Sequence, residues 1–256
     1  MTAQVHRLPR AAEAAPRIRP QSRRILLAVE LRKAVDTRPA RLLIVVTLLA
    51  SLVVLGYDLA HVTDQAVFSD MVQGSVAPLT VFLPALAVLA MTSEWSQRTA
   101  LVTFALSPWR SRVLICKAGA ALLIGAAVTA IVVVLTALAA LLAGLAAGHL
   151  SFAHAESGAG AAFASVGIDV LMGVAFGALI TSTPAALVAY YVVPTVWGGV
   201  LTSAGGWSAW VNVTDAVARI SHLKPGGFSA ETFTAVTIWV LAPAAAGLVV
   251  GARRAP

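Results

Sequence analysis

The chain is poor in charged side chains: Asp, Glu, Lys and Arg make up 11% of its 256 residues, against about 25% in an ordinary soluble domain. Hydrophobic residues make up 59% of the sequence, and the mean hydropathy is +0.87. This balance excludes an intrinsically disordered chain, which is rich in charge and poor in apolar residues. It also argues against a soluble globular enzyme and favours an all-α, polytopic membrane protein.

Signatures of common catalytic and redox proteins are missing as well. Cys116 is the single cysteine, so an intrachain disulfide is excluded and a small buried thiol is expected. No lysine follows a G-x-x-x-x-G-K-S/T loop, so the chain lacks the phosphate-binding element of a nucleotide-driven motor. No G-x-S-x-G or H-E-x-x-H motif occurs, and His149 and His154 alone are too sparse a set for a metal site.

Long runs without a charged residue predict the membrane-spanning helices. A helix needs about 20 apolar residues to cross the hydrocarbon core of a bilayer. The run 170–214 is long enough for two helices. It should divide at Thr181-Ser182-Thr183-Pro184, because proline disfavours helix in the residue before it and is well tolerated at a helix start. Six spans are therefore predicted, at 42–60, 76–93, 114–147, 162–182, 184–204 and 232–252.

The positive charges predict the orientation in the membrane. Of the 18 Lys and Arg residues, all except Arg219 and Lys224 lie before the first span, in or beside the loop between spans two and three, or at the C-terminal end. By the positive-inside rule these places are cytoplasmic, so both termini are expected inside the cell. The net charge of +7 then reflects topology and anionic lipid rather than nucleic acid, in a multi-pass protein of the cell membrane.

Two segments precede the first span. Residues 1–21 are expected to form a flexible basic arm, and residues 22–38 an amphipathic helix, capped by Ser22, that lies flat at the cytoplasmic interface. This helix is either a simple anchor or an elbow that also braces a cytoplasmic partner. Its expected apolar face comprises Leu27, Leu31, Ala34 and Val35, and its polar face Glu30, Arg32, Lys33 and Asp36.

The loop after span two combines polar and apolar segments. The stretch 94–99 is polar, 100–106 reads as a short apolar helix, and 107–112 is polar and basic. The apolar part is too short to cross a membrane between those charges, so its surface needs cover from the chain or from a partner. The pattern favours a docking element over a simple set of positive-inside anchors.

Several of these segments resemble the membrane subunits of ABC-2-type ABC transporters. The resemblance rests on ELRKAVDTR, EWSQRTALVTFALSPWRSRVLICK and GVAFGALITSTPAALVAYYVVPTVW, and it covers nearly the whole chain from Glu30 onward. In that family an acidic residue closes span two, a Thr follows, and a Pro-x-Arg stretch with a Lys precedes span three. The matching positions here are held by Glu94, Thr99, Pro108, Arg110, Arg112 and Lys117.

The resemblance implies an export permease that binds no cofactor itself. It would pair with a second copy or a similar permease and with separate ATPase subunits, which bind ATP and Mg. The elbow helix and the loop after span two would contact the ATPases and transmit their closure to the membrane helices. The residues implied for this coupling are Glu94, Arg98, Thr99, Arg110 and Arg112 in the loop, and Glu30, Lys33 and Arg38 in the elbow.

Asp169 is the one acidic residue well inside a predicted span, and an intramembrane charge suggests function. As a proton or cation site it would indicate an ion-coupled secondary transporter. As a structural group it would bond neighbouring hydroxyls or backbone, or face an aqueous cleft. Gly173 and Gly177 on the same helix form a small-x-x-x-small pair that predicts close helix packing. A membrane-embedded enzyme is a further alternative, although no residues in the sequence indicate its chemistry.

The outer segment 205–231 predicts a further short helix. Trp207 and Trp210 favour an interfacial anchor, and a cap over an exit path is the alternative. Pro194 and Pro243 each remove a helical hydrogen bond and predict bends in spans five and six.

Overall fold

The computed structural model describes residues 22–61, 68–96, 110–147, 155–201, 205–221 and 229–253. Apart from short turns these residues are helical, and no strand occurs among them, which confirms the predicted all-α class. The elements in chain order are α1 (Arg23–Asp36), α2 (Arg38–Ala60), α3 (Phe68–Ser96), α5 (Arg110–Ala147), α6 (Ala155–Leu179), α7 (Thr183–Leu201), η1 (Gly206–Trp210), α8 (Val213–Ser221), α9 (Ala230–Val236), η2 (Thr237–Leu241) and α10 (Ala242–Arg253).

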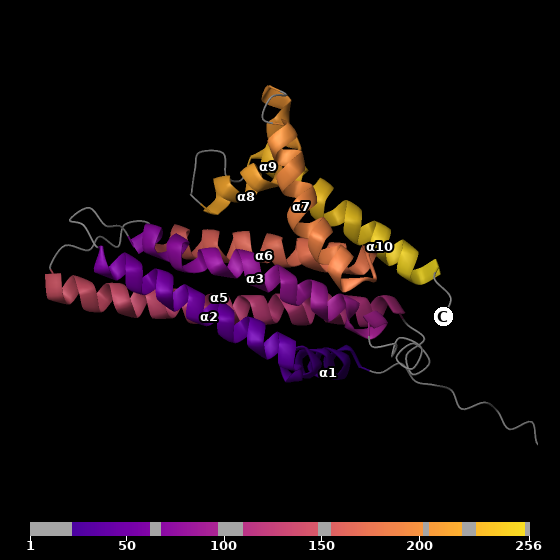
Figure 1. The fold of residues 1–256 in the computed structure, drawn as a ribbon, viewed down its shortest axis with the longest axis horizontal. Helices are drawn as coiled ribbons and strands as arrows, with labels where there is room; N and C mark the ends of the chain where they lie inside the picture. The colour runs from indigo at the N-terminus through magenta and orange to yellow at the C-terminus, as the bar shows by residue number, and fades with distance from the viewer. Residues whose placement is uncertain are drawn as a thin grey trace, which may run out of the picture.

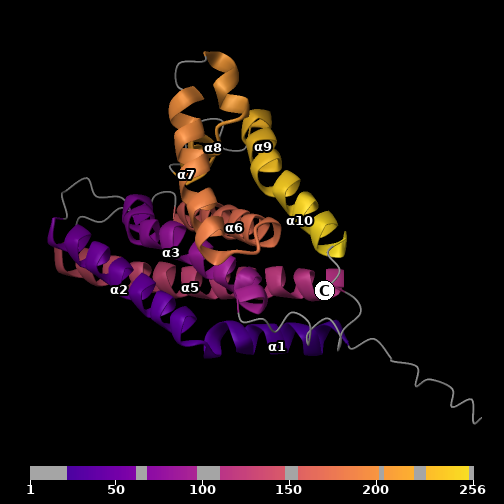
Figure 2. The same ribbon diagram turned by 45° about the vertical axis from the view of Figure 1, so that its right-hand side comes forward.

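Four long helices, α2, α3, α5 and α6, run side by side along the long axis of the molecule and form a bundle (Figure 1 and Figure 2). α3 is central, because it packs along α6, α2 and α5. Most of its fully covered side chains are apolar, among them Val72, Leu79 and Leu83. The main core of the protein therefore surrounds α3.

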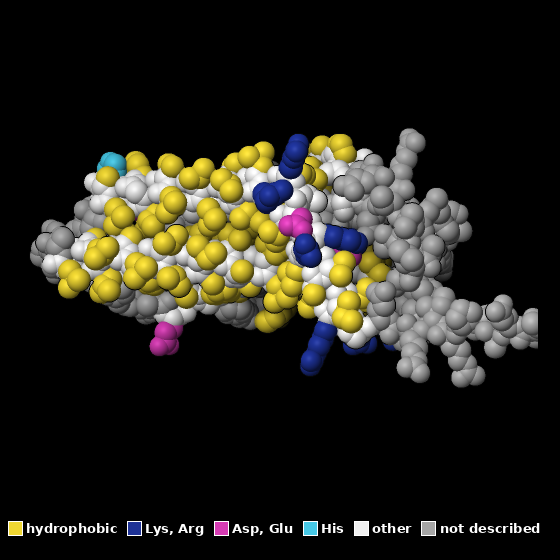
Figure 3. Space-filling model, turned by 90° about the horizontal axis from the view of Figure 1, so that it is seen from below, with side chains coloured by type: hydrophobic (Ala, Val, Ile, Leu, Met, Phe, Trp, Pro, Cys, Tyr) yellow, Lys and Arg dark blue, Asp and Glu magenta, His cyan; other side chains and the backbone are white. Residues whose placement is uncertain are grey.

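Five helical stretches are long and apolar enough to cross a membrane: 38–60, 68–93, 112–145, 156–179 and 230–247. Hydrophobic side chains cover most of the bundle face seen in Figure 3, and Lys and Arg gather toward the end where α1 lies. Leu42 and Leu142 are among the exposed leucines of α2 and α5. Apolar cover of this extent is typical of a surface that faces lipid, so the chain is a multi-helix membrane protein.

The fifth predicted span is present as a helix but is not among those five. α7 has 19 residues, near the lower end of the roughly 17–25 that a membrane-crossing helix needs. The predicted break before it is confirmed, since α6 ends at Leu179 and α7 begins at Thr183 with Pro184 in its first turn. α7 rises steeply from the bundle in both views, whereas α10 slants back toward it (Figure 1 and Figure 2).

Among the helices that begin before their predicted spans, α3 and α6 show the largest extensions. α3 is already helical at Phe68 rather than at residue 76, and α6 at Ala155 rather than at 162. The extra turns are rich in polar and small residues, such as Asp70, Gln73 and Glu156, which continue the helices beyond their apolar parts.

The predicted packing of the Gly173–Gly177 pair is confirmed. A Cβ atom on Gly173 would lie 2.6 Å from the carbonyl oxygen of Pro84, and one on Gly177 would lie 3.2 Å from the backbone of Val88. α6 therefore approaches α3 at backbone distance, which only small residues permit. This contact fixes the rotation of α6 and the direction of the residues one turn earlier, including Asp169.

The last span accommodates Pro243 through a change of helix type. Residues Thr237–Leu241 form a π-helix between α9 and α10, and the amide of Ala242 donates to the carbonyl of Thr237. Pro243 has no amide hydrogen and crowds the preceding turn, and a π segment is one of the ways in which a helix absorbs such a residue. α7, in contrast, continues as an α-helix through Pro194.

Candidate functional site

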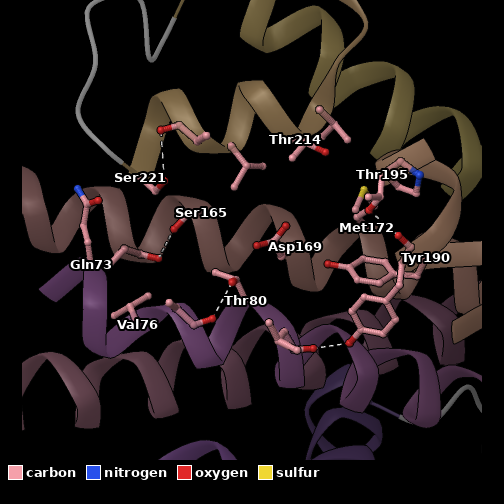
Figure 4. A pocket seen from close by; sticks show the side chains of 18 of the residues that line it. Gln73, Val76, Thr80, Ser165, Asp169, Met172, Tyr190, Thr195, Thr214 and Ser221 are labelled. Carbon is pink, nitrogen blue, oxygen red and sulfur yellow. Dashed lines mark hydrogen bonds between the residues drawn. The ribbon is translucent and has the colours of Figure 1, made fainter. Parts of the chain in front are cut away.

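A cavity of about 780 Å³ lies between α3, α6, α7 and α8 (Figure 4). Its volume falls within the roughly 300–1,000 Å³ of sites for small molecules. The cavity is bordered by the early turns of α3 and by the first half of α6, in the half of the bundle remote from α1. Its polar lining consists of Asp70, Gln73, Thr80, Ser165, Asp169, Tyr190, Tyr191, Thr195, Thr214 and Ser221.

Asp169 is the most buried charged group of this lining, with 7% of its surface exposed. The hydroxyl of Tyr190 points toward it across the cavity (Figure 4). No hydrogen bond to Asp169 occurs within the described part of the chain. The expectation that its carboxylate bonds neighbouring hydroxyls or backbone is therefore not met there. The expectation that Asp169 faces a cleft is met.

Most serine and threonine hydroxyls of the cavity wall are engaged as donors. Thr80 donates to the carbonyl of Ala77 at 2.8 Å, and Thr195 donates to the carbonyl of Tyr191 at 2.7 Å. Ser165 and Ser221 likewise donate to the backbone of their own helices. Because the hydrogens are used in this way, the oxygen lone pairs are what these side chains offer to the cavity.

Tyr190 and Tyr191 connect α7 to the rest of the cavity wall. Their rings meet edge to face with centroids 4.7 Å apart, and Tyr190 also meets Phe176 of α6. The Tyr191 hydroxyl donates to the carbonyl of Val81 on α3. These contacts position two aromatic rings beside Asp169, although sequence reasoning had treated the stretch only as membrane helix.

The segment 205–221 forms one wall of the cavity through α8. Asn212 caps α8, since its Oδ1 accepts from the amides of Thr214 and Asp215 at 3.1 and 3.3 Å. Val213, Ala216 and Ile220 are buried on the inner face of α8, which packs on α6. Trp207 and Trp210 are exposed, as expected of interfacial tryptophans. An interfacial anchor and a cap over an exit path both stay predictions.

At the other end of the bundle, a buried ion pair joins α1 to α5. Lys117 Nζ lies 2.8 Å from Glu30 Oε2, and the two side chains are 5% and 7% exposed. Lys33, which is half exposed, reaches Glu30 Oε1 at 3.2 Å. Beside this pair, Leu27 packs near Gly119, and Cys116 is buried with its Sγ 3.9 Å from the carbonyl oxygen of Arg23.

The predicted faces of α1 need two corrections. Ser22 caps the helix, Arg32 pairs with Asp36 at 3.3 Å on the exposed side, and Leu27, Leu31 and Ala34 turn inward, as expected. Glu30, however, is buried instead of lying on the polar face. Its partner Lys117 is 87 positions away, so helical periodicity alone could not reveal the pair. Val35, expected on the apolar face, is 42% exposed.

The predicted coupling residues fall partly outside the described residues. Glu94 lies near the end of α3 and Arg110 is the first residue of α5, so the described structure gives only their backbone positions. Arg112 is partly buried at the start of α5, and Arg38 is exposed at the start of α2. The segment 97–109, with Arg98 and Thr99, and the arm 1–21 are not described.

Within the described ranges, no group of three His, Cys, Asp or Glu side chains is placed to hold a metal ion. His149 and His154 lie outside those ranges. No family model, curated protein or solved structure matches the chain. The cavity around Asp169 and the Glu30–Lys117 pair are therefore its two candidate functional features.

Proposed function

We propose that the chain is a membrane permease subunit of an ATP-binding-cassette exporter, driven by separate ATPase subunits that bind ATP and Mg. The observation that carries the proposal is the buried pair between Glu30 and Lys117. It joins α1 to the first turns of α5 at the cationic end of the bundle. A push on α1 would therefore move α5 with it, which is the mechanical property that an externally driven transporter needs.

The proposal assigns the rest of the chain as follows. Both termini lie in the cytoplasm, because the cationic end of the bundle is the inner end. α7 is the sixth span, and a second copy or a similar permease completes the assembly. Lys33 and Arg38 on α1 and α2, together with Glu94, Arg98, Thr99, Arg110 and Arg112, contact the ATPase. The cavity around Asp169 belongs to the substrate path.

The assignment is tested by purifying the tagged chain from its native membrane and identifying ATPases with a phosphate-binding loop in the preparation. Glu94→Ala and Arg110→Ala should reduce the bound ATPase and ATP-dependent transport in vesicles while leaving membrane insertion unchanged. Arg219→Ala is the matched control, because this arginine lies on α8 at the opposite end of the bundle. Transport by vesicles that contain the chain without any ATPase would contradict the proposal.

One observation favours a second candidate, an ion-coupled secondary transporter. Asp169 is a buried carboxylate that faces a cavity in the membrane helices, and such groups commonly form proton or cation pathways. In that case a sodium or proton gradient would drive flux in vesicles without ATP, and Asp169→Asn would abolish it. The same vesicle experiment thus separates the two candidates.

A further inference from the structure

The cavity wall combines two carboxylates and several hydroxyl acceptors with the donor groups of Gln73, Tyr190 and Thr214. Asp70 and Asp169 contribute carboxylates, and no Lys, Arg or His occurs among the described residues of the lining. The nearby Arg219 of α8 is engaged elsewhere, since it donates to the Thr232 hydroxyl and to the carbonyl of Ala209. Thr80, Ser165, Thr195 and Ser221 donate their hydroxyl hydrogens to their own helices, so these four side chains offer lone pairs that add to the negative charge of the two carboxylates.

Prolines in the surrounding helices add further acceptors. Pro78 and Pro84 lie inside α3, and Pro194 lies inside α7. A proline lacks the amide that would pair with the carbonyl four residues earlier. Those carbonyls belong to Gly74, Thr80 and Tyr190, and all three residues line the cavity. Backbone carbonyls released in this way are used by membrane transporters to hold cations.

The remainder of the wall is apolar and aromatic. Val76, Val81 and Val217 contribute aliphatic surface, and Tyr190 and Tyr191 contribute rings. Aromatic faces attract organic cations. A cavity of about 780 Å³ is far larger than a metal or alkali ion requires, and it matches a molecule of drug size.

We propose that this cavity binds an amphipathic organic cation, in which an ammonium group pairs with Asp169 and an apolar body lies against the valines and tyrosines. The assignment rests on the proposed transport function and names the substrate class of that path. Asp169 is suited to the role because only 7% of its surface is exposed and its carboxylate has no hydrogen-bond partner among the described residues. A buried carboxylate without a partner is costly, and an ammonium ligand would satisfy it with a charge-assisted hydrogen bond.

The test uses the full chain alone in lipid nanodiscs, without an ATPase. Two probes are compared by their intrinsic fluorescence: 2-(1-naphthyl)ethylamine, which is a cation at neutral pH, and its N-acetyl derivative, which has the same apolar body and no charge. The amine should bind at least about tenfold more tightly than the amide, the factor expected of a hydrogen bond to a charged group. Equal affinity of the two probes for the wild-type chain would overturn the proposal.

Two variants locate the binding. Asp169→Asn should weaken amine binding by about tenfold and remove the preference over the amide. Asp36→Asn, the same change in an exposed carboxylate of α1 that does not line the cavity, should leave both affinities unchanged. Ala218→Phe keeps Asp169 and fills the cavity from α8, so it should weaken both probes.

Competing results have distinct meanings. Suppose that millimolar sodium displaces the amine, and that without sodium the amine and the amide bind equally well. This result would assign Asp169 to an inorganic cation and overturn the proposal. Amine preference that persists in Asp169→Asn would also overturn it. Because no ATPase is present, failed binding refutes the substrate class alone, whereas the loss or persistence of ATP-driven transport decides the proposed function separately.

Discussion

Removing the positive partner of the buried ion pair should release α1 from the bundle. In Lys117→Met, the Glu30 carboxylate stays 7% exposed and keeps only Lys33, whose side chain is half in solvent. Breaking a buried pair by removing one partner costs about 3–5 kcal/mol. Because Lys33 offsets part of this loss, we expect α1 docking to weaken by about 3 kcal/mol, the lower end of that range.

The single cysteine of the chain reports on this docking. Cys116 is buried beside the backbone of Arg23, so a water-soluble maleimide should reach its thiol mainly when α1 opens. If opening is fast relative to labelling, the rate follows the open population, and about 3 kcal/mol corresponds to roughly a hundredfold faster labelling. Labelling is followed by mass spectrometry on the purified chain under native conditions.

Two variants provide the controls. Lys33→Met removes the half-exposed partner, so it should accelerate labelling by no more than about fivefold, equivalent to about 1 kcal/mol. Glu30→Leu combined with Lys117→Met replaces the whole pair by apolar groups and should label nearly as slowly as the wild type, since such replacements are often close to neutral. Equal rates in Lys117→Met and wild type, or a double variant as fast as the single one, would refute the reasoning.

Three further changes probe other contacts. Gly173→Ala places a methyl group 2.6 Å from a backbone oxygen of α3 and should cost about 1–3 kcal/mol in thermal unfolding, while Gly167→Ala, which meets nothing within 4 Å, should not destabilise the protein. Thr136→Val removes a 2.8 Å bond to Ser75 between α5 and α3, and a loss near 0.6 kcal/mol is expected from the average of such bonds in membranes. Asn212→Ala removes the cap of α8 and should cost about 1 kcal/mol, visible as faster hydrogen exchange of the α8 amides. These assignments would be contradicted if Gly173→Ala left thermal stability unchanged or if Thr136→Val lowered the free energy of unfolding by more than about 2 kcal/mol. They would also be contradicted if Asn212→Ala left the hydrogen exchange of the α8 amides unchanged.

The features that follow from local composition could be predicted from the sequence. Charge-free runs identified the helices because lipid excludes charge along a whole span, and Pro184 marked the turn between α6 and α7 because it constrains the residue before it. The Gly173–Gly177 pair predicted a close helix–helix contact, which α6 makes with α3, because small residues four positions apart lie on one face of a helix.

The features that depend on distant residues could not be predicted. Glu30 is buried because Lys117 compensates its charge, and the helical pattern of α1 contains no trace of that partner. The cavity requires four helices at particular angles, and the steep rise of α7 has no signature in its own sequence. Asp70 and Gln73 gave a weak signal, as polar residues next to an apolar run, and they proved to continue α3 along the cavity.

The π-helical turn ahead of Pro243 rotates α10 about the helix axis relative to α9, so the two ends of the last membrane segment face different neighbours. One residue of an α-helix advances the chain by about 100°, so an inserted residue rotates everything that follows by that amount. Gly247 is thereby presented to Ala178 of α6, while α9 keeps its own orientation toward α8. Deleting one residue from Thr237–Leu241 would rotate Gly247 away from α6 and place a bulkier side chain at that contact. The composition of the segment would scarcely change.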